Sequence, residues 1–242
     1  KTAKRLAALE GDDDSVLLDT AAIAETDPLF AASLLRTANS AAYWLAGRVD
    51  SVAMAMTILD KDGAITASQR GAGAGISDAR IEPLLRRACR CAAGTAALAR
   101  VTNRAGAGAA YTAGLLHEMG CFALAVVSPQ KFFEIDPDLT GDERIRMERK
   151  YFTASYIEAG ASLAARWRLP DNLCLAIRHV LTPLKAAKAR DLAAMVSLAA
   201  LAAAQPNQLI PALFNARDDA IRHLALDMSQ LIQTLDAAIK EA

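Results

Sequence analysis

Signals for the start of a helix recur along this chain, and they constrain its fold more than any other feature. Asp27-Pro28, Ser128-Pro129 and Thr182-Pro183 each place an oxygen-bearing side chain before a proline. Such a side chain caps free backbone N–H groups, and the fixed φ of proline suits the first helical turn. Thr140 to Glu143 has the spacing of a capping box, and the acidic run Asp12 to Asp14 suits the positive end of a helix. These signals predict a chain of many helices.

The apolar residues indicate the same class. They make up 53% of the 242 residues, yet aromatic residues account for only 5%, and alanine dominates the rest. Alanine and leucine favour helix, and alanine lets neighbouring helices approach closely. The alternation of apolar and polar residues that would indicate a strand never extends beyond a few positions. The sequence therefore predicts an all-α fold.

Glycines divide the chain into two expected lobes. Gly63, Gly71, Gly73 and Gly75 cluster between residues 60 and 78. We therefore expect one domain with an N-terminal helical lobe over residues 1–60, a glycine-rich connector over 61–80 and a larger helical lobe over 81–242. Helices are expected at Val16–Glu25, Leu29–Ser40, Ile81–Asn103, Ala109–Val127, Thr140–Tyr151, Tyr156–Trp167, Asp171–Val180, Ala186–Ala204 and Arg217–Ala242.

Charge and apolar runs limit the partners. The 27 basic and 27 acidic residues cancel, whereas electrostatic capture of nucleic acid needs a basic excess. Arg86, Arg87 and Arg90 crowd one stretch, which we interpret as a solvated helix face. The longest nearly apolar run, Leu192–Ala204, is shorter than the roughly 20 residues that span a membrane. We therefore expect neither a nucleic-acid nor a membrane partner.

The cysteines and the chain ends bear on the compartment. The four cysteines form neither a disulfide framework nor a zinc-binding spacing, and no signal peptide is visible. A reducing cytoplasm fits this usage best. The chain begins at Lys1 rather than at a methionine, so we expect it to be a fragment of a longer protein.

No complete set of catalytic or metal-binding residues stands out. His117, His179 and His223 are isolated, whereas helical metal sites commonly pair two histidines three or four positions apart. The glycine clusters lack the Lys-Ser/Thr pair of a P-loop and the third glycine of a dinucleotide fingerprint. A nucleophile elbow is also missing from the sequence. From the residues alone, we expect no enzyme activity and no cofactor.

The segment from Asn39 to Trp44 is open to two interpretations. Asn39 and Ser40 end an apolar helix, where their side chains can bond free backbone groups, and Tyr43 and Trp44 follow closely. The segment is either a helix stop followed by aromatic packing, or a polar hinge beside an exposed aromatic patch that docks a partner.

Five segments taken in order resemble the HDOD family, regulatory relatives of the HD-type metal phosphohydrolases. Residues 27–40 resemble its N-terminal signature, and residues 51–59 the helix that follows. Residues 113–120, AGLLHEMG, resemble the segment that names the HD fold. Residues 159–170, ending in Trp-Arg-Leu-Pro, and residues 176–179 resemble the later helices. The resemblance covers roughly residues 15 to 205 and implies an N-terminal helical lobe packed on an HD-like helical lobe.

The resemblance also implies where metal ligands would lie in an active relative. His117 and His179 keep two histidine positions, while Glu118 stands in place of the metal-bridging aspartate. Other residues occupy the remaining positions: Cys91, Tyr156, Val180 and Ala199 or Ala200. Tyrosine and valine do not replace neutral imidazole on a divalent ion. We therefore expect no metal, and we regard His117, Glu118 and His179 as vestigial positions.

The resemblance implies a non-catalytic bacterial signal-transduction output domain that acts by protein–protein interaction. A fused receiver or cyclic-dinucleotide module is among the partners that it implies. The interaction surface that we predict consists of Arg36, Asn39, Ser40, Tyr43 and Trp44. Two alternatives stay open: a residual metal-dependent phosphohydrolase acting on nucleotides or cyclic dinucleotides, and a small-molecule sensor that uses the emptied metal cavity.

Overall fold

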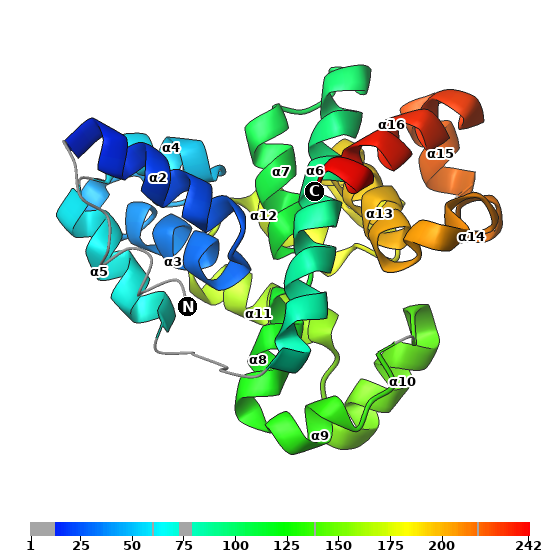
Figure 1. Cartoon of the computed structure of the whole chain (residues 1–242), viewed down its shortest axis with the longest axis horizontal. Helices are drawn as coiled ribbons and strands as arrows, with labels where there is room; N and C mark the ends of the chain where they lie inside the picture. The colour runs from blue at the N-terminus through cyan, green and yellow to red at the C-terminus, as the bar shows by residue number, and fades with distance from the viewer. Residues whose placement is uncertain (1–12, 60, 73–78, 138, 217) are drawn as a thin grey trace.

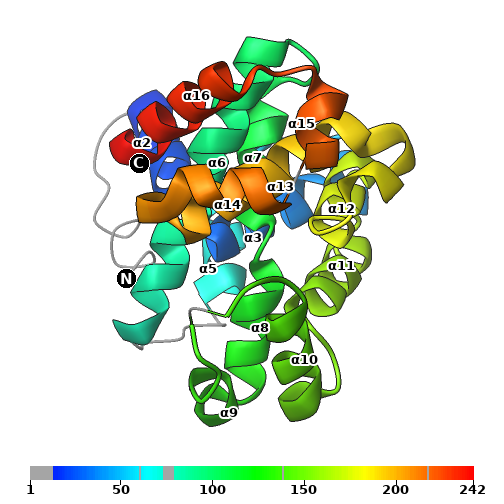
Figure 2. The same ribbon diagram turned by 90° about the vertical axis from the view of Figure 1, so that its right-hand side faces the viewer.

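A computed structural model describes residues 13–59, 61–72, 79–137, 139–216 and 218–242. All regular secondary structure within these ranges is helical, which confirms the predicted all-α class. Figure 1 shows the N-terminal helices on one side of the long helix α6 (Glu82–Thr102) and the C-terminal helices on the other. Viewed from the side, α8 (Met119–Val127), α9 (Pro129–Phe133) and α10 (Gly141–Phe152) form one end of the molecule (Figure 2).

The N-terminal lobe is built around α3 (Pro28–Ala38). The predicted cap forms, because Asp27 Oδ1 accepts hydrogen bonds from the backbone N–H groups of Leu29 and Phe30 at 3.0 and 3.1 Å. Leu34 and Leu35 are fully buried. Around α3 pack the other helices of the lobe, α2 (Asp13–Glu25), α4 (Val52–Ile58) and α5 (Lys61–Ala72), and the short 3₁₀ turn η1 (Ala41–Tyr43) follows it.

The predicted connector over residues 61–80 is wrong in its first part. Residues 61–72 form α5, in which Ala64 and Ala67 are buried, and the Ser33 hydroxyl donates to Ala67 O at 2.6 Å. Packing against α3 therefore outweighs the roughly 1 kcal/mol that a glycine costs inside a helix. Gly73 and Gly75 lie outside the described residues, and the short turn η2 (Ala79–Ile81) precedes α6.

The second lobe surrounds α6. Its partners include α7 (Ala107–Leu116), α13 (Arg190–Ala204) and α16 (Met228–Glu241). Small residues set these distances, since a Cβ on Gly114 of α7 would lie 2.7 Å from Ala92 Cα in α6. The other helices of the lobe are α11 (Tyr156–Arg166), α12 (Asp171–Arg178), α14 (Leu209–Ala216) and α15 (Asp218–Leu224), with 3₁₀ turns at Pro183–Lys185, Ala187–Ala189 and Pro206–Gln208.

Two helices expected to be continuous are broken. The predicted helix Ala109–Val127 forms as α7 and α8, and the predicted helix Arg217–Ala242 forms as α15 and α16, with Ala225 between them at φ +53°. By length and composition alone, residues 107–127 could cross a membrane, and so could a sharply bent pair over residues 187–213. Inside the fold, 78% of the apolar window in 107–127 is buried, as in a core helix.

Capping differs from the prediction at several helix starts. Helical turns begin after Ser128 and Thr182 as predicted, but neither side chain makes the predicted capping hydrogen bond. Helix α10 begins after Thr140 as predicted, but the Thr140 side chain makes no capping hydrogen bond, so the capping box predicted there is wrong. A capping box forms instead at α11, where Ser155 and Glu158 each bond the backbone N–H of the other.

The two lobes share one core. A continuous cluster of buried apolar side chains includes Leu34 and Leu35 of α3 together with Leu115 of α7 and Leu198 of α13. The Val52 backbone N–H, at the start of α4, also donates to the Thr112 hydroxyl of α7 at 3.3 Å. The N-terminal lobe is therefore packed on the larger lobe, as predicted.

Candidate functional site

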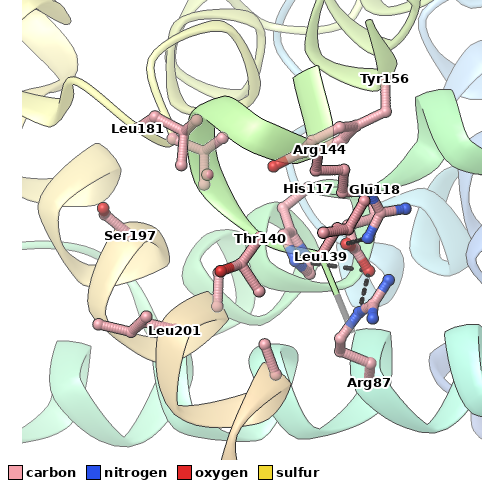
Figure 3. Close-up of a pocket in the computed structure, with 14 residues that line it drawn as sticks. Arg87, His117, Glu118, Leu139, Thr140, Arg144, Tyr156, Leu181, Ser197 and Leu201 are labelled. Atoms are coloured by element: carbon pink, nitrogen blue, oxygen red, sulfur yellow. Dashed lines mark hydrogen bonds and ion pairs between the residues drawn. The ribbon is translucent and has the colours of Figure 1, made fainter. Parts of the chain in front are cut away.

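A cavity of about 160 Å³ lies beside the break between α7 and α8. His117 and Glu118 occupy this break, and the cavity also receives residues from α6, α10, α11 and α13. Figure 3 shows Arg87, Glu118 and Arg144 together on one side of it, with Leu181 and Leu201 on the other. The lining residues are Arg87, His117, Glu118, Leu139, Thr140, Gly141, Arg144, Tyr156, Val180, Leu181, Ser197, Ala200, Leu201 and Ala204.

The structure brings together most of the positions where the family resemblance placed metal ligands. His117, Glu118, Tyr156, Val180 and Ala200 all line this cavity. Two predicted positions lie elsewhere. Cys91 is fully buried, with its Sγ 3.9 Å from Val196 O, and His179 lines a different hollow on the surface.

Two arginines hold the Glu118 carboxylate. Arg87 Nε donates to its Oε2 at 2.6 Å, and Arg144 Nη1 donates to its Oε1 at 3.4 Å. Arg144 Nε also donates to Glu148 Oε1 at 2.9 Å, and its Nη2 to Cys121 Sγ at 3.0 Å. Glu118 and Glu148 are buried, so two guanidinium groups balance two carboxylates with little help from water. The prediction that Arg87 lies on a solvated helix face is therefore wrong.

The same network fixes the surrounding helices. The second carboxylate oxygen of Glu148, Oε2, accepts the backbone N–H of Tyr156 at 2.7 Å, which ties α10 to the start of α11. Arg144 also lies over the Tyr156 ring, 5.1 Å from its centroid. The network thus connects α6, the α7–α8 break, α10 and α11.

The protonation states follow from this geometry. Burial alone would raise the pKa of Glu118, but Arg87, His117 and Arg144 outweigh it and lower the pKa to about 2. Burial lowers the pKa of His117, so its imidazole is neutral near pH 7. The His117 Nδ1 atom lies 2.6 Å from Gly114 O, and a neutral ring bonded there carries its proton on Nδ1.

The predicted interaction surface is only partly a surface. Asn39 is fully buried: its amide donates to Leu35 O and Val49 O at 2.9 and 2.8 Å, and its Oδ1 accepts from the backbone of Arg48 and Val49. Asn39 therefore holds the following loop in place and is not available to a partner. The helix-stop interpretation applies to this residue.

The aromatic part of the segment behaves differently. The Trp44 side chain is 91% exposed and its backbone has φ +56°, in the left-handed region that bulky residues rarely adopt. Ser40 and Tyr43 are half-buried, and Tyr43 packs against the core. Arg36 is exposed and lies 5.8 Å from the centroid of the Trp167 ring.

A wide hollow of about 710 Å³ is lined in part by the residues that follow Trp44 in the sequence. It is lined by Ala46 and Gly47 from the loop after Trp44 and by residues of α11, α12 and the turn between them. Arg168 and Arg178 give this hollow a basic character, and the Asp171 carboxylate on it is paired with Lys188 at 2.7 Å. Burial and the neighbouring Arg178 and Lys185 lower the pKa of His179.

Comparison with known families agrees with the fold. The HDOD domain family matches residues 1–183, about three quarters of the chain. The chain belongs to the HDOD family. No protein with a curated description matches it in sequence.

Solved structures with this HDOD fold come from several bacteria. The MmoQ response regulator from Methylococcus capsulatus is 20% identical over 97% of this chain and 93% of that chain, with a TM-score of 0.71. A virulence factor from Campylobacter jejuni is 19% identical over 99% and 93%, with a TM-score of 0.70. A Marinobacter aquaeolei protein, named provisionally as a signal transduction protein, is 25% identical over 99% of this chain and 56% of that chain, with a TM-score of 0.58.

The cavity of this HDOD domain does not fit the metal ion of HD-type enzymes. Both oxygens of Glu118 are engaged by arginines, whose positive charge opposes a cation at the same place. The side chains of Val180 and Ala200 have no atom that can bind a metal ion, and His179 lies outside the cavity. Among the described residues, no group of three or more histidine, cysteine or acidic side chains could hold a metal ion.

Two important residues could not be predicted from the sequence. Arg144 and Glu148 belong to α10, whose sequence GDERIRMERKYF looks like an exposed, charged helix. Their spacing of four residues is a signal for an ion pair along one helix, but such pairs are usually exposed. The partner that makes them part of the site, Glu118, lies 26 residues away from Arg144 in the sequence.

Proposed function

We propose that this HDOD domain is a non-catalytic output module of bacterial signal transduction that acts by binding a protein partner. The observation that carries the proposal is the engagement of Glu118 by Arg87 and Arg144. An HD-type phosphohydrolase needs an open metal position at which water is activated. Here the guanidinium groups of Arg87 and Arg144 are paired with the Glu118 carboxylate, which would have to bind the metal. The response-regulator name of the MmoQ structure supports a signalling role.

The partner surface that we propose is centred on Trp44. A tryptophan with 91% of its side chain exposed has no packing role in the isolated domain, and tryptophan is enriched among the residues that dominate interface energies. Arg36 lies beside Trp167, and Tyr43 supports the loop from the core side. We therefore assign docking to Arg36, Tyr43 and Trp44, with Ser40 at the edge. The proposed setting is the cytoplasm, without nucleic acid or membrane as partner.

Site-specific photo-crosslinking in the host that encodes the chain tests this surface. A photoreactive phenylalanine replaces Trp44, and in a matched control it replaces Leu18, which is 73% exposed on α2. We expect a discrete crosslinked protein at position 44, absent at position 18, and lost when Arg36→Glu is added. The same product from both positions, or none from position 44 with the fold intact, would contradict the docking proposal.

The main alternative is a residual metal-dependent phosphohydrolase. His117 favours it, because a histidine with Nδ1 bonded to a backbone carbonyl is held as metal-ligating histidines are. This alternative requires phosphoester hydrolysis with added manganese, iron or magnesium, and loss of that activity in His117→Ala. A small-molecule sensor remains the second alternative.

A further inference from the structure

A second cavity, of about 260 Å³, lies between α6, α9 and α10 and shares two residues with the first. Its walls are mainly apolar: Leu84, Phe132 and Ile135 are buried, and Phe133 is half-buried. Arg87 and Arg144 line both cavities. The remaining lining residues are Arg80, Pro83, Asp136, Pro137 and Glu148.

The two shared arginines differ in how many of their N–H groups are used. Arg144 donates from all three guanidinium nitrogens, to Glu148, Glu118 and Cys121. Arg87 donates from Nε to Glu118, and the described part of the chain provides no hydrogen bond to its two terminal amines. Its side chain is only 17% exposed. A largely buried guanidinium with unused donors can form a strong paired contact with a ligand carboxylate or phosphate.

The aromatic wall is held in place. The Arg80 guanidinium lies 3.9 Å from the centroid of the Phe133 ring, and the Phe132 and Phe133 rings pack edge to face with centroids 5.3 Å apart. A preformed apolar cavity with a few convergent polar groups is the usual form of a small-molecule site. This cavity has those features, and none of its lining residues is a position where the family resemblance placed a metal ligand.

The size and charge of the cavity restrict the ligand. A cavity of about 150 Å³ can take one benzene ring, so this larger one has room for a ring with a short acidic chain. Of the two arginines that line both cavities, Arg144 already donates from all three nitrogens, so only the terminal amines of Arg87 are left to pair with a ligand, which suits one carboxylate. Glu148 repels such a carboxylate little, because Arg144 neutralises it. The fit is therefore to a monoanion with an apolar body.

We propose that this cavity is a binding site for a small aromatic monocarboxylate. The carboxylate pairs with the terminal amines of Arg87, and the ring lies against Leu84, Phe132 and Phe133. Arg87 also holds Glu118, so an occupied cavity changes the charge around the network beside the α7–α8 break. The inference goes beyond the proposed docking function, because it gives the domain an input of its own.

Isothermal titration calorimetry on the purified chain tests the site, with 3-phenylpropionate as the probe and its neutral amide as the matched compound. We expect the acid to bind at least tenfold more tightly than the amide. Arg87→Met should reduce the affinity for the acid at least tenfold. Arg86→Met, which removes an exposed charge from the same helix, should leave that affinity unchanged.

A second variant keeps the test decisive if Arg87→Met does not fold. Leu84→Trp fills the cavity while retaining Arg87, and we expect it to abolish binding of the acid to a folded chain. Equal affinity for acid and amide, undiminished binding in Leu84→Trp, or no binding of the acid at millimolar concentration would overturn the proposal. None of these results depends on a protein partner, so failure here is distinguishable from failure of the docking surface.

Discussion

Two guanidinium groups hold the Glu118 carboxylate in a place where little water reaches it. Taking charges out of water costs several kcal/mol for each ion, and the ion pairs repay this only while every partner is present. The network is complete because Arg144 bonds both Glu118 and Glu148, while Arg87 bonds Glu118 from a different helix. Removing one arginine should therefore matter far more than removing one at the surface.

The first residue-scale prediction concerns Arg144→Met. It leaves Glu148 without its arginine and Glu118 with one instead of two, so we expect the free energy of unfolding to fall by about 3–5 kcal/mol in urea titrations. The control is Arg222→Met, which breaks an exposed pair with Asp218 and should cause no measurable change. Similar effects of the two substitutions would show that the buried network contributes no special stability.

The second residue-scale prediction concerns pH. Burial lowers the pKa of His117 in the folded chain below that of an unfolded histidine, about 6.5. As pH falls through that value, the unfolded chain binds the proton first, so stability is full above it and declines below. His117→Gln should flatten the stability profile between about pH 7.5 and 5, and the partly exposed His179→Gln should flatten it less. An unchanged slope in His117→Gln would refute this assignment.

At the scale of the helix, the break between α7 and α8 decides where the site lies. Residues 117 and 118 are neither glycine nor proline, so the sequence contains no local signal for the break, and we predicted one continuous helix there. The break accompanies a close tertiary contact, since a Cβ on Gly120 would lie 1.8 Å from Tyr156 O in α11. Such contacts join residues far apart in the chain, and periodicity within one helix does not contain them.

The element-scale prediction follows from this contact. Gly120→Ala forces α8 away from α11, and we expect a loss of about 3 kcal/mol or more in the free energy of unfolding. Gly108→Ala in α7 is the control, because its Cβ would meet only the Ser51 side chain, at 3.3 Å. The control should stay within about 1 kcal/mol of the parent chain, since the gain in helix propensity offsets that contact. Thermal unfolding of both variants measures the difference.

The helices that could be predicted from the sequence are those with local signals, namely a capping residue or a periodic apolar pattern. The Asp27 cap and most helices of the second lobe lie near their predicted positions, because capping and apolar periodicity are encoded locally. Helix α5 and the burial of Arg144 could not be predicted, because α5 is stabilised by α3 and Arg144 by Glu118. The gathering of Tyr156 and Ala200 around one cavity was predicted only through the family resemblance.

At the scale of the whole molecule, one apolar core joins the lobes, and the functional features lie on different parts of it. The charged network lines the cavity at the α7–α8 break, while Trp44 is exposed on the loop that buried Asn39 holds in place. We propose that a structural ion-pair centre lies where HD-type enzymes bind their metal, and that the partner surface lies elsewhere, around Trp44.

The metal content of the chain shows directly whether the cavity beside the α7–α8 break binds a catalytic metal. It is measured after purification without chelator and incubation with manganese, iron or magnesium. We expect far less than one metal ion per chain, no stabilisation by the metals in thermal unfolding, and no hydrolysis of a phosphodiester substrate. Near-stoichiometric metal, lost together with hydrolysis in His117→Ala, would contradict the account, because a metal would then share Glu118 with Arg87 and Arg144.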